Sequence, residues 1–336
     1  MRRDRRRFLA LTLLSLAFAP GAGGAAEIVD ATGRHVALPA GIARVMPAGP
    51  PAAVLLAALA PEMMTGWPHP PAAAAAALLA APLAALPKSP PLEPAAQAAI
   101  AATHPDLIVD YGTVSPRYVA RARDTQAGVP VLLFDGGLEK VPDILRQLGT
   151  ALGRAARGED LARMAADILA ARRPDAMRRV VYVRGEPDAL IAAAPGSQPF
   201  ETLRVAGWQV LAPAGEAGEK FRPVTAAAIA ALDPDVLILT DPAARAALAT
   251  APEWRAVRAL REGHAYIAPM LPFGWFEEPP SINRLLGLLW TEHYADPAAL
   301  AARAASVQAA LYGRTASAAE TAALRDALAP ILIATP

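Results

Sequence analysis

The sequence AAIAATHPDLIVD at Ala98–Asp110 recurs with few changes as AAIAALDPDVLIL at Ala227–Leu239. Each copy contains an alanine-rich helical segment, a Pro-Asp turn and an apolar run typical of a buried strand. One such unit in each half of the chain predicts two lobes of related fold. We therefore expect an α/β protein with two related lobes, each built around a central sheet.

The region between the two copies contains two long helical patterns, Leu138–Leu152 and Gly158–Met177. No Gly/Ser-rich linker separates the halves, so a helix is the connector and a rigid hinge is expected. The helices at the end of the chain follow a similar apolar periodicity. We expect an N-terminal lobe over 27–155, a connecting helix over 156–178 and a C-terminal lobe with terminal helices over 179–336.

The N-terminus has the pattern of a secretory signal. The basic segment Met1–Arg7 precedes the apolar run Phe8–Phe18, and small residues follow up to Ala26. Within it, RRRFL at Arg5–Leu9 resembles the twin-arginine export pattern. A retained membrane anchor would need a longer apolar span. We expect residues 1–26 to be a signal peptide and the protein to be exported to the periplasm.

Composition excludes several classes of function. The 336-residue chain has no cysteine, which excludes disulfides, thiolate metal sites and thiol nucleophiles. Loss of the arginine-rich signal changes the formal net charge from +1 to slightly negative, which disfavours binding to nucleic acid. The sequence lacks the G-x-S-x-G, P-loop, H-E-x-x-H and G-x-G-x-x-G motifs. We expect a binding protein, with no catalytic residues, rather than an enzyme.

The order of the motifs resembles the class III periplasmic substrate-binding proteins of ABC importers, which serve ferric siderophores, vitamin B12, haem and related metal chelates. The matching segments are DATGRHVALPAGIARVMPAG, HPDLIVDYG, GVPVLLFD, FRPVTAAAIAALDPDVLILTDP, WRAVRALREGHAYIAP and PPSINRLLGLLW. The resemblance implies two α/β lobes joined by one long helix, with a ligand cleft between them and little hinge closure. It also implies a monomer without a cofactor that binds a small metal chelate and delivers it to a permease.

The chain departs from the family at the two positions that dock the permease. Family members commonly carry one glutamate per lobe at the first position of each repeat copy, where this chain has Ala98 and Ala227. Glu93 and Glu219 are near these positions but out of register. Either docking uses other charges, or the protein is a periplasmic sensor or accessory protein that does not dock a permease.

Ligand-binding residues are expected at strand ends and in the loops that follow them. The loop that opens PMLPFGWFEEPPSINRLLGLLW at Pro269–Trp290 contains three aromatic residues and is expected to form the lip of the second lobe. The candidate ligand contacts are Met46, Gly49, Trp67, His69, Tyr111, Arg184, Phe273, Trp275 and Phe276.

Several of these residues have two interpretations. Trp67 and Trp275 could form flat walls against a chelate or pack in the core. Tyr111 could ligate iron or hydrogen-bond a chelate, or lie on the surface of its lobe. Arg184 could hold a carboxylate, a haem propionate or an oxyanion in bidentate fashion, or form a surface ion pair with Glu186 or Asp188.

The sequence predicts no protein-bound metal. Glu277 and Glu278 are interpreted as acids that favour the start of the following helix. His69 with Met46, Met63 and Met64 could form a soft-metal site. The favoured interpretation is that the methionines lie in the core and the histidine lies in a loop beside them. The resemblance therefore favours a metal chelate as the ligand. A small oxyanion or a nickel-type metal complex is the alternative in the same fold.

Overall fold

The computed structural model describes residues 27–116, 119–120, 128–171, 177–186 and 189–332. The expected signal peptide, 1–26, lies outside these residues. Among the helices that are described, none is both long enough and apolar enough to cross a membrane. A short antiparallel ribbon, β1 (Glu27–Val29) with β2 (His35–Ala37), opens the described chain.

The first lobe is built on a parallel sheet in the order β3-β4-β5, namely β3 (Val45–Pro47), β4 (Leu107–Gly112) and β5 (Val131–Asp135). All residues of β4 are buried, as expected of a parallel strand covered on both faces. Its helices are α1 (Pro50–Leu59), α2 (Ala73–Ala76), α3 (Ala81–Ala84), α4 (Gln97–Ala102) and α6 (Val141–Ala151), with 3₁₀ turns at Pro61–Met63, Pro94–Ala96 and Leu138–Lys140.

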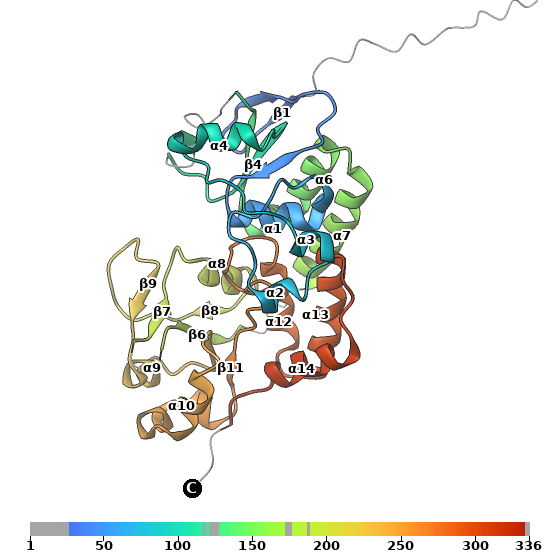
Figure 1. Ribbon diagram of the computed structural model, residues 1–336. Helices are drawn as coiled ribbons and strands as arrows, with labels where there is room; N and C mark the ends of the chain where they lie inside the picture. Colours follow the sequence, from blue (N-terminus) through green and yellow to red (C-terminus); the bar gives the residue numbers. More distant parts are fainter. Residues whose placement is uncertain (1–26, 117–118, 121–127, 172–176, 187–188, 333–336) are drawn as a thin grey trace, which may run out of the picture.

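The second lobe is built on a six-stranded sheet in the order β11-β10-β6-β7-β9, with β8 also paired to β6. Its strands are β6 (Arg179–Arg184), β7 (Ile191–Ala193), β8 (Gln209–Val210), β9 (Phe221–Pro223), β10 (Val236–Leu239) and β11 (Ala265–Ile267). The helices of this half are α8 (Gln198–Val205), α9 (Ala226–Leu232), α10 (Ala244–Thr250), α11 (Arg258–Arg261), α12 (Arg284–His293), α13 (Pro297–Tyr312) and α14 (Ala318–Leu328), with a 3₁₀ turn at Pro252–Ala256. The expected two-lobe α/β fold is confirmed (Figure 1).

Helix α7 (Ala155–Ala171) follows the first lobe and precedes β6, within the stretch expected to connect the lobes. It crosses α6 closely because glycines face each other: a Cβ on Gly158 would lie 2.5 Å from the Leu145 carbonyl oxygen. Helices α12 and α13 lie beside α7 where the lobes meet (Figure 1). Arg157 of α7 donates to the carbonyl oxygens of Ala58 and Ala310, at 2.8 and 2.5 Å. One apolar core therefore extends through both halves of the chain.

The two repeat copies share a pattern of local hydrogen bonds as well as their amino-acid sequence. In the first lobe, Arg44 at the start of β3 donates to the Thr103 and His104 carbonyl oxygens at the end of α4. Asp106 accepts from the Ala43 and Arg44 amides, both at 2.8 Å. This set of contacts ties the turn of the repeat unit to the beginning of the neighbouring strand.

The second lobe repeats this arrangement at β6 and α9. Arg179 donates to the Leu232 and Asp233 carbonyl oxygens, and Asp235 accepts from the Arg179 amide at 3.0 Å. His104 and Asp233, which occupy equivalent positions, both have left-handed backbone conformations, with φ of 47° and 46°. The predicted duplication of a helix–turn–strand unit is therefore confirmed in three dimensions.

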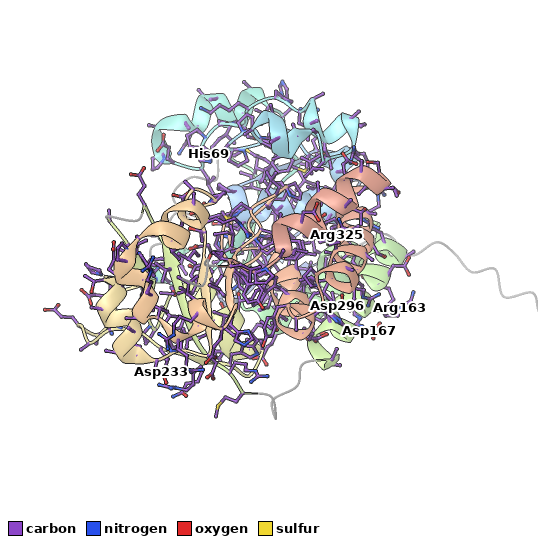
Figure 2. All side chains as sticks on the ribbon, turned by 90° about the horizontal axis from the view of Figure 1, so that it is seen from below. His69, Arg163, Asp167, Asp233, Asp296 and Arg325 are labelled. Carbon is purple, nitrogen blue, oxygen red and sulfur yellow. The ribbon has the colours of Figure 1, made fainter. Side chains whose placement is uncertain are left out.

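Asp106→Ala should destabilise the protein by about 1–3 kcal/mol, because two backbone amides lose a charged acceptor. Urea unfolding monitored by circular dichroism measures the effect. Asp167→Ala is the control, since Asp167 is exposed on α7 (Figure 2) and its replacement should change the stability by less than about 0.5 kcal/mol. Equal stabilities for Asp106→Ala and the wild type would contradict a structural role for this contact.

Candidate functional site

The aromatic loop after β11 turns inward rather than lying open. Trp275 is 0% exposed, and its indole Nε1 donates to the Leu271 carbonyl oxygen at 3.3 Å. Phe276 packs against Tyr182 and Trp290, with ring centroids 5.5 and 5.7 Å apart. In this conformation Trp275 and Phe276 belong to the core, which is the second of the two interpretations given for Trp275.

Two other predicted residues meet across the halves of the chain. The Trp67 and Phe273 rings lie 5.8 Å apart, and Phe273 also contacts Tyr312 of α13 at 5.4 Å. The Trp67 indole donates to the Leu83 carbonyl oxygen at 2.8 Å. Phe273 is the most exposed of these aromatic residues, although it is still half-buried. The Trp67–Phe273 contact therefore fixes the tip of the loop against the first lobe.

Five residues from three segments meet at the carboxyl end of β6, and we call them the strand-end cluster. They are Tyr182 and Arg184 of β6, Phe221 of β9, and Glu277 and Glu278 of the aromatic loop. Arg184 Nη1 lies 3.1 Å from Glu277 Oε2 and 3.5 Å from Glu278 Oε1. The guanidinium carbon stands 3.9 Å over the centre of the Phe221 ring. The Tyr182 hydroxyl donates to Glu277 Oε1 at 2.9 Å.

The two carboxyl groups of the cluster differ in environment. The Glu277 side chain is 7% exposed, whereas that of Glu278 is 62% exposed. Burial raises the pKa of Glu277, and the bonds from Tyr182 and Arg184 act in the opposite direction. The interpretation of Glu277 as a helix-start acid is wrong, because it is bonded to β6 and α12 does not begin until Arg284. Among the described residues, the ion-pair partners of Arg184 are Glu277 and Glu278 and not Glu186, whereas Asp188, the other partner that the sequence suggested, lies outside the described residues.

The remaining predicted residues do not join this cluster. Met46 and Tyr111 are fully buried in the first lobe, and Gly49 is the half-buried residue before α1. Burial raises the pKa of Tyr111 to about 12, against the effect of the nearby Arg284 guanidinium. His69 is exposed, whereas Met63 and Met64 are buried. Within the described residues, no three His, Asp or Glu side chains are grouped so that they could hold a metal ion.

A residue that the sequence did not single out joins the two lobes. Arg284 of α12, with its side chain 1% exposed, donates from Nη1 to Glu201 at 2.8 Å and from Nη2 to the Gly136 carbonyl oxygen at 2.6 Å. The other Glu201 oxygen accepts from the Leu138 amide at 3.0 Å. The sequence did contain a signal, since a lone arginine within the apolar run after Ile282 must be paired if its helix is buried.

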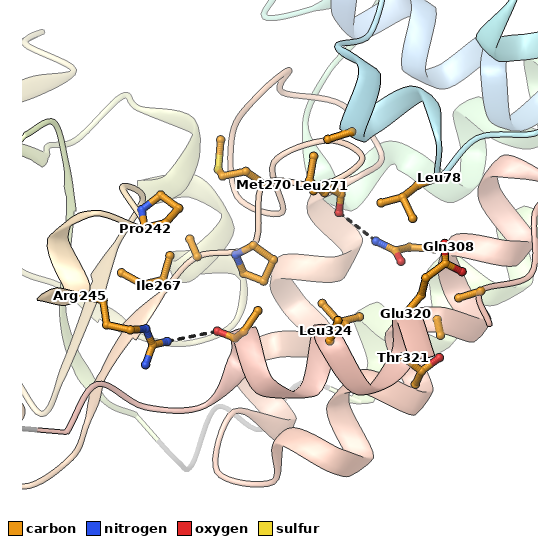
Figure 3. Close-up of a pocket in the computed structure, with 17 residues that line it drawn as sticks. Leu78, Pro242, Arg245, Ile267, Met270, Leu271, Gln308, Glu320, Thr321 and Leu324 are labelled. Carbon is orange, nitrogen blue, oxygen red and sulfur yellow. Dashed lines mark hydrogen bonds between the residues drawn. The ribbon is translucent and has the colours of Figure 1, made fainter. Parts of the chain in front are cut away.

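A cavity of about 470 Å³ opens between α2, α13, α14, the start of α10 and the end of β11 (Figure 3). Pro269, Met270 and Leu271, at the start of the aromatic loop, form part of its wall. None of the nine predicted contact residues lines it. Sequence patterns missed the cavity because its wall consists mainly of alanine, leucine and proline side chains, which look like ordinary core residues.

The model of the family described as periplasmic binding protein matches residues 72–270. An ABC transporter solute binding protein from Sulfurospirillum deleyianum has a similar structure, with a TM-score of 0.77 and 20% identity, over 89% of this chain and 98% of that chain. No curated protein matches the sequence.

Two further solved structures show the same fold. The molybdate periplasmic binding protein MolA of Haemophilus influenzae gives a TM-score of 0.62 at 17% identity, over 87% of this chain and 99% of that chain. A periplasmic heme binding protein from Pseudomonas aeruginosa gives 0.51 at 24% identity, over 82% of this chain and 94% of that chain. At these identities the similarity concerns the fold.

The buried carboxyl of Glu277 should make stability depend on pH. Because its pKa is raised from the ordinary 4.5, the folded state holds the proton more tightly than the unfolded chain does. This contribution to stability is present at low pH and is lost as the pH rises through the raised pKa. The Tm of the wild type minus that of Glu277→Gln should therefore fall as the pH rises above the ordinary pKa of 4.5. A Tm difference that does not change with pH would contradict a raised pKa of Glu277 in the folded state.

Proposed function

Since this chain belongs to the periplasmic binding protein family, whose members bind solutes for ABC transporters and are not enzymes, we propose that it captures a metal chelate in the periplasm and delivers it to an ABC importer. The ligand would be a ferric siderophore, a cobalamin or a haem-like chelate. It would be held non-covalently and without chemical change. In this proposal residues 1–26 direct export, and the protein works as a monomer.

The observation that carries the ligand class is the charge of the strand-end cluster. One guanidinium, Arg184, faces two carboxyl groups, and Glu278 is exposed to an incoming ligand. Such a group attracts a chelate with positive charge near its surface, so within the proposed class it favours a cationic ferric siderophore over a haem with its anionic propionates. The Arg184–Phe221 stack adds a flat face suited to the apolar part of a chelate.

The oxyanion alternative fits this cluster less well. An anion brought to Arg184 Nη1 would meet two carboxyl groups that lie within 3.5 Å of the same nitrogen. Repulsion between like charges would offset the attraction of the guanidinium. MolA binds molybdate in the same fold, but at 17% identity its ligand cannot be inferred for this chain.

The proposal includes docking to a permease without the usual pair of glutamates. Ala98 on α4 and Ala227 on α9 are both exposed, so the two repeat copies present methyl groups at these positions. Docking then depends on other surface groups. The alternative, a periplasmic sensor or accessory protein, is favoured by these same two alanines and would bind the ligand without delivering it to a permease.

Titration of the full chain, followed by tryptophan fluorescence, tests the ligand class. The panel is ferrioxamine B (a cationic ferric hydroxamate), cobalamin, haem, nickel–histidine and molybdate. We expect saturable binding of a chelate from the first three and none of molybdate. Glu278→Gln should weaken binding of ferrioxamine B roughly fivefold, the effect of one screened charge contact of about 1 kcal/mol.

Glu253→Gln is the matched control, because Glu253 is exposed on the 3₁₀ turn at Pro252–Ala256, away from the residues of the cluster. It should bind like the wild type. Binding of molybdate alone would overturn the chelate proposal. An unchanged Kd in Glu278→Gln would remove the cluster from the site even if a chelate binds.

A further inference from the structure

The cavity between α13, α14 and α2 has walls from both halves of the chain. Ala74 and Leu78 line it from the first half, whereas Ile267, Ala305 and Leu324 line it from the second (Figure 3). Its volume of about 470 Å³ is within the usual range of small-molecule sites. A molecule bound here would contact both halves of the chain at once.

The charged residues at the edge of the cavity are already compensated by the protein. Arg245 donates to the Ala329 and Pro330 carbonyl oxygens at 3.0 and 3.1 Å. Glu320 accepts from Arg314 at 2.7 Å and from the Ser317 amide at 2.7 Å. The Arg314 guanidinium, together with Ser317, lowers the pKa of Glu320 to about 2. A charged ligand group would have to break one of these pairings.

The uncharged polar side chains that line the cavity are Gln308 and Thr321, and the Thr321 hydroxyl already donates to the Ser317 carbonyl oxygen at 3.0 Å. Gln308 of α13 donates from Nε2 to the Leu271 carbonyl oxygen at 3.1 Å, as the dashed line in Figure 3 shows. Its amide oxygen is an acceptor for a single ligand donor. Leu78, Ile267 and Leu324, which also line the cavity, are aliphatic. This combination suits an uncharged ligand that is mainly apolar and has at most a few polar atoms.

We propose that this cavity is a second ligand site, separate from the strand-end cluster, and that it takes a neutral, mainly apolar small molecule. None of the five cluster residues lines it. The inference rests on the cavity itself and not on the proposed transport function. Occupancy braces α2 of the first half against α13 and α14 of the second, so a bound molecule also stabilises the contact between the halves.

The probe is N-phenyl-1-naphthylamine, an uncharged apolar fluorophore whose emission rises in apolar surroundings. Titrated into the full chain, it should give a saturable increase with one molecule bound. Ala305→Phe places a ring in the cavity, and Leu78→Glu places a carboxylate in its opposite wall. Each should weaken binding roughly tenfold or more, as expected when apolar contacts worth about 1.5 kcal/mol are lost.

Ala302→Phe is the matched control, because Ala302 is exposed on the same helix and does not line the cavity. It should bind the probe like the wild type, and so should Glu278→Gln, which alters only the strand-end cluster. Circular dichroism identifies which variants are folded, and Leu78→Glu serves if Ala305→Phe is not. Absence of saturable binding to the wild type, wild-type affinity in a folded cavity variant, or loss of binding in Glu278→Gln would overturn the proposal.

Discussion

The buried guanidinium of Arg284 is the central polar contact between the two lobes, within the apolar core that both share. An ion removed from water costs several kcal/mol unless it is fully paired, and Arg284 is paired with Glu201 and with a main-chain oxygen of the first lobe. Glu201 in turn accepts from the Leu138 amide, so the ion pair is bonded to the first lobe on both sides. Because separating the lobes would remove the Gly136 and Leu138 bonds from this buried pair, the pair helps to hold the loops at the strand ends in a set arrangement before any ligand arrives.

Much of the fold could be predicted from the sequence because the same helix–turn–strand unit occurs once in each lobe. The Pro-Asp turn recurs because Asp106 and Asp235 each accept from the amide at the start of a neighbouring strand. Arg44 and Arg179 each cap the helix before that turn. These contacts are local to one repeat unit, so a short sequence pattern is enough to indicate them. The capping box of Ser317 and Glu320 at the start of α14 is another contact that is local in the sequence.

The candidate site was harder to predict, because burial depends on contacts between distant segments. A loop containing Trp275 and Phe276 looks like a ligand wall in the sequence, but Gly287 of α12 allows the loop backbone to approach so closely that these rings enter the core. From the sequence, Glu277 is interpreted as a helix-start acid, because its bonds to Tyr182 and Arg184 join segments that are far apart in the chain. Among the predicted contacts, Arg184 lies in a group that is both polar and partly open. The cavity beside α13 has no sequence signal at all, since alanine and leucine line it.

The buried bonds between the lobes and the two carboxyl groups at the end of β6 are the basis of our proposal that the protein receives a preformed chelate rather than closing around a bare ion. The direct measurement is a crystal structure of the protein with ferrioxamine B, using the anomalous scattering of iron to locate the ligand. The account predicts an iron peak beside the strand-end cluster, with Glu278 and Arg184 facing the chelate and the Arg284–Glu201 pair unchanged. An iron peak elsewhere, or a structure in which that ion pair is broken, would contradict it.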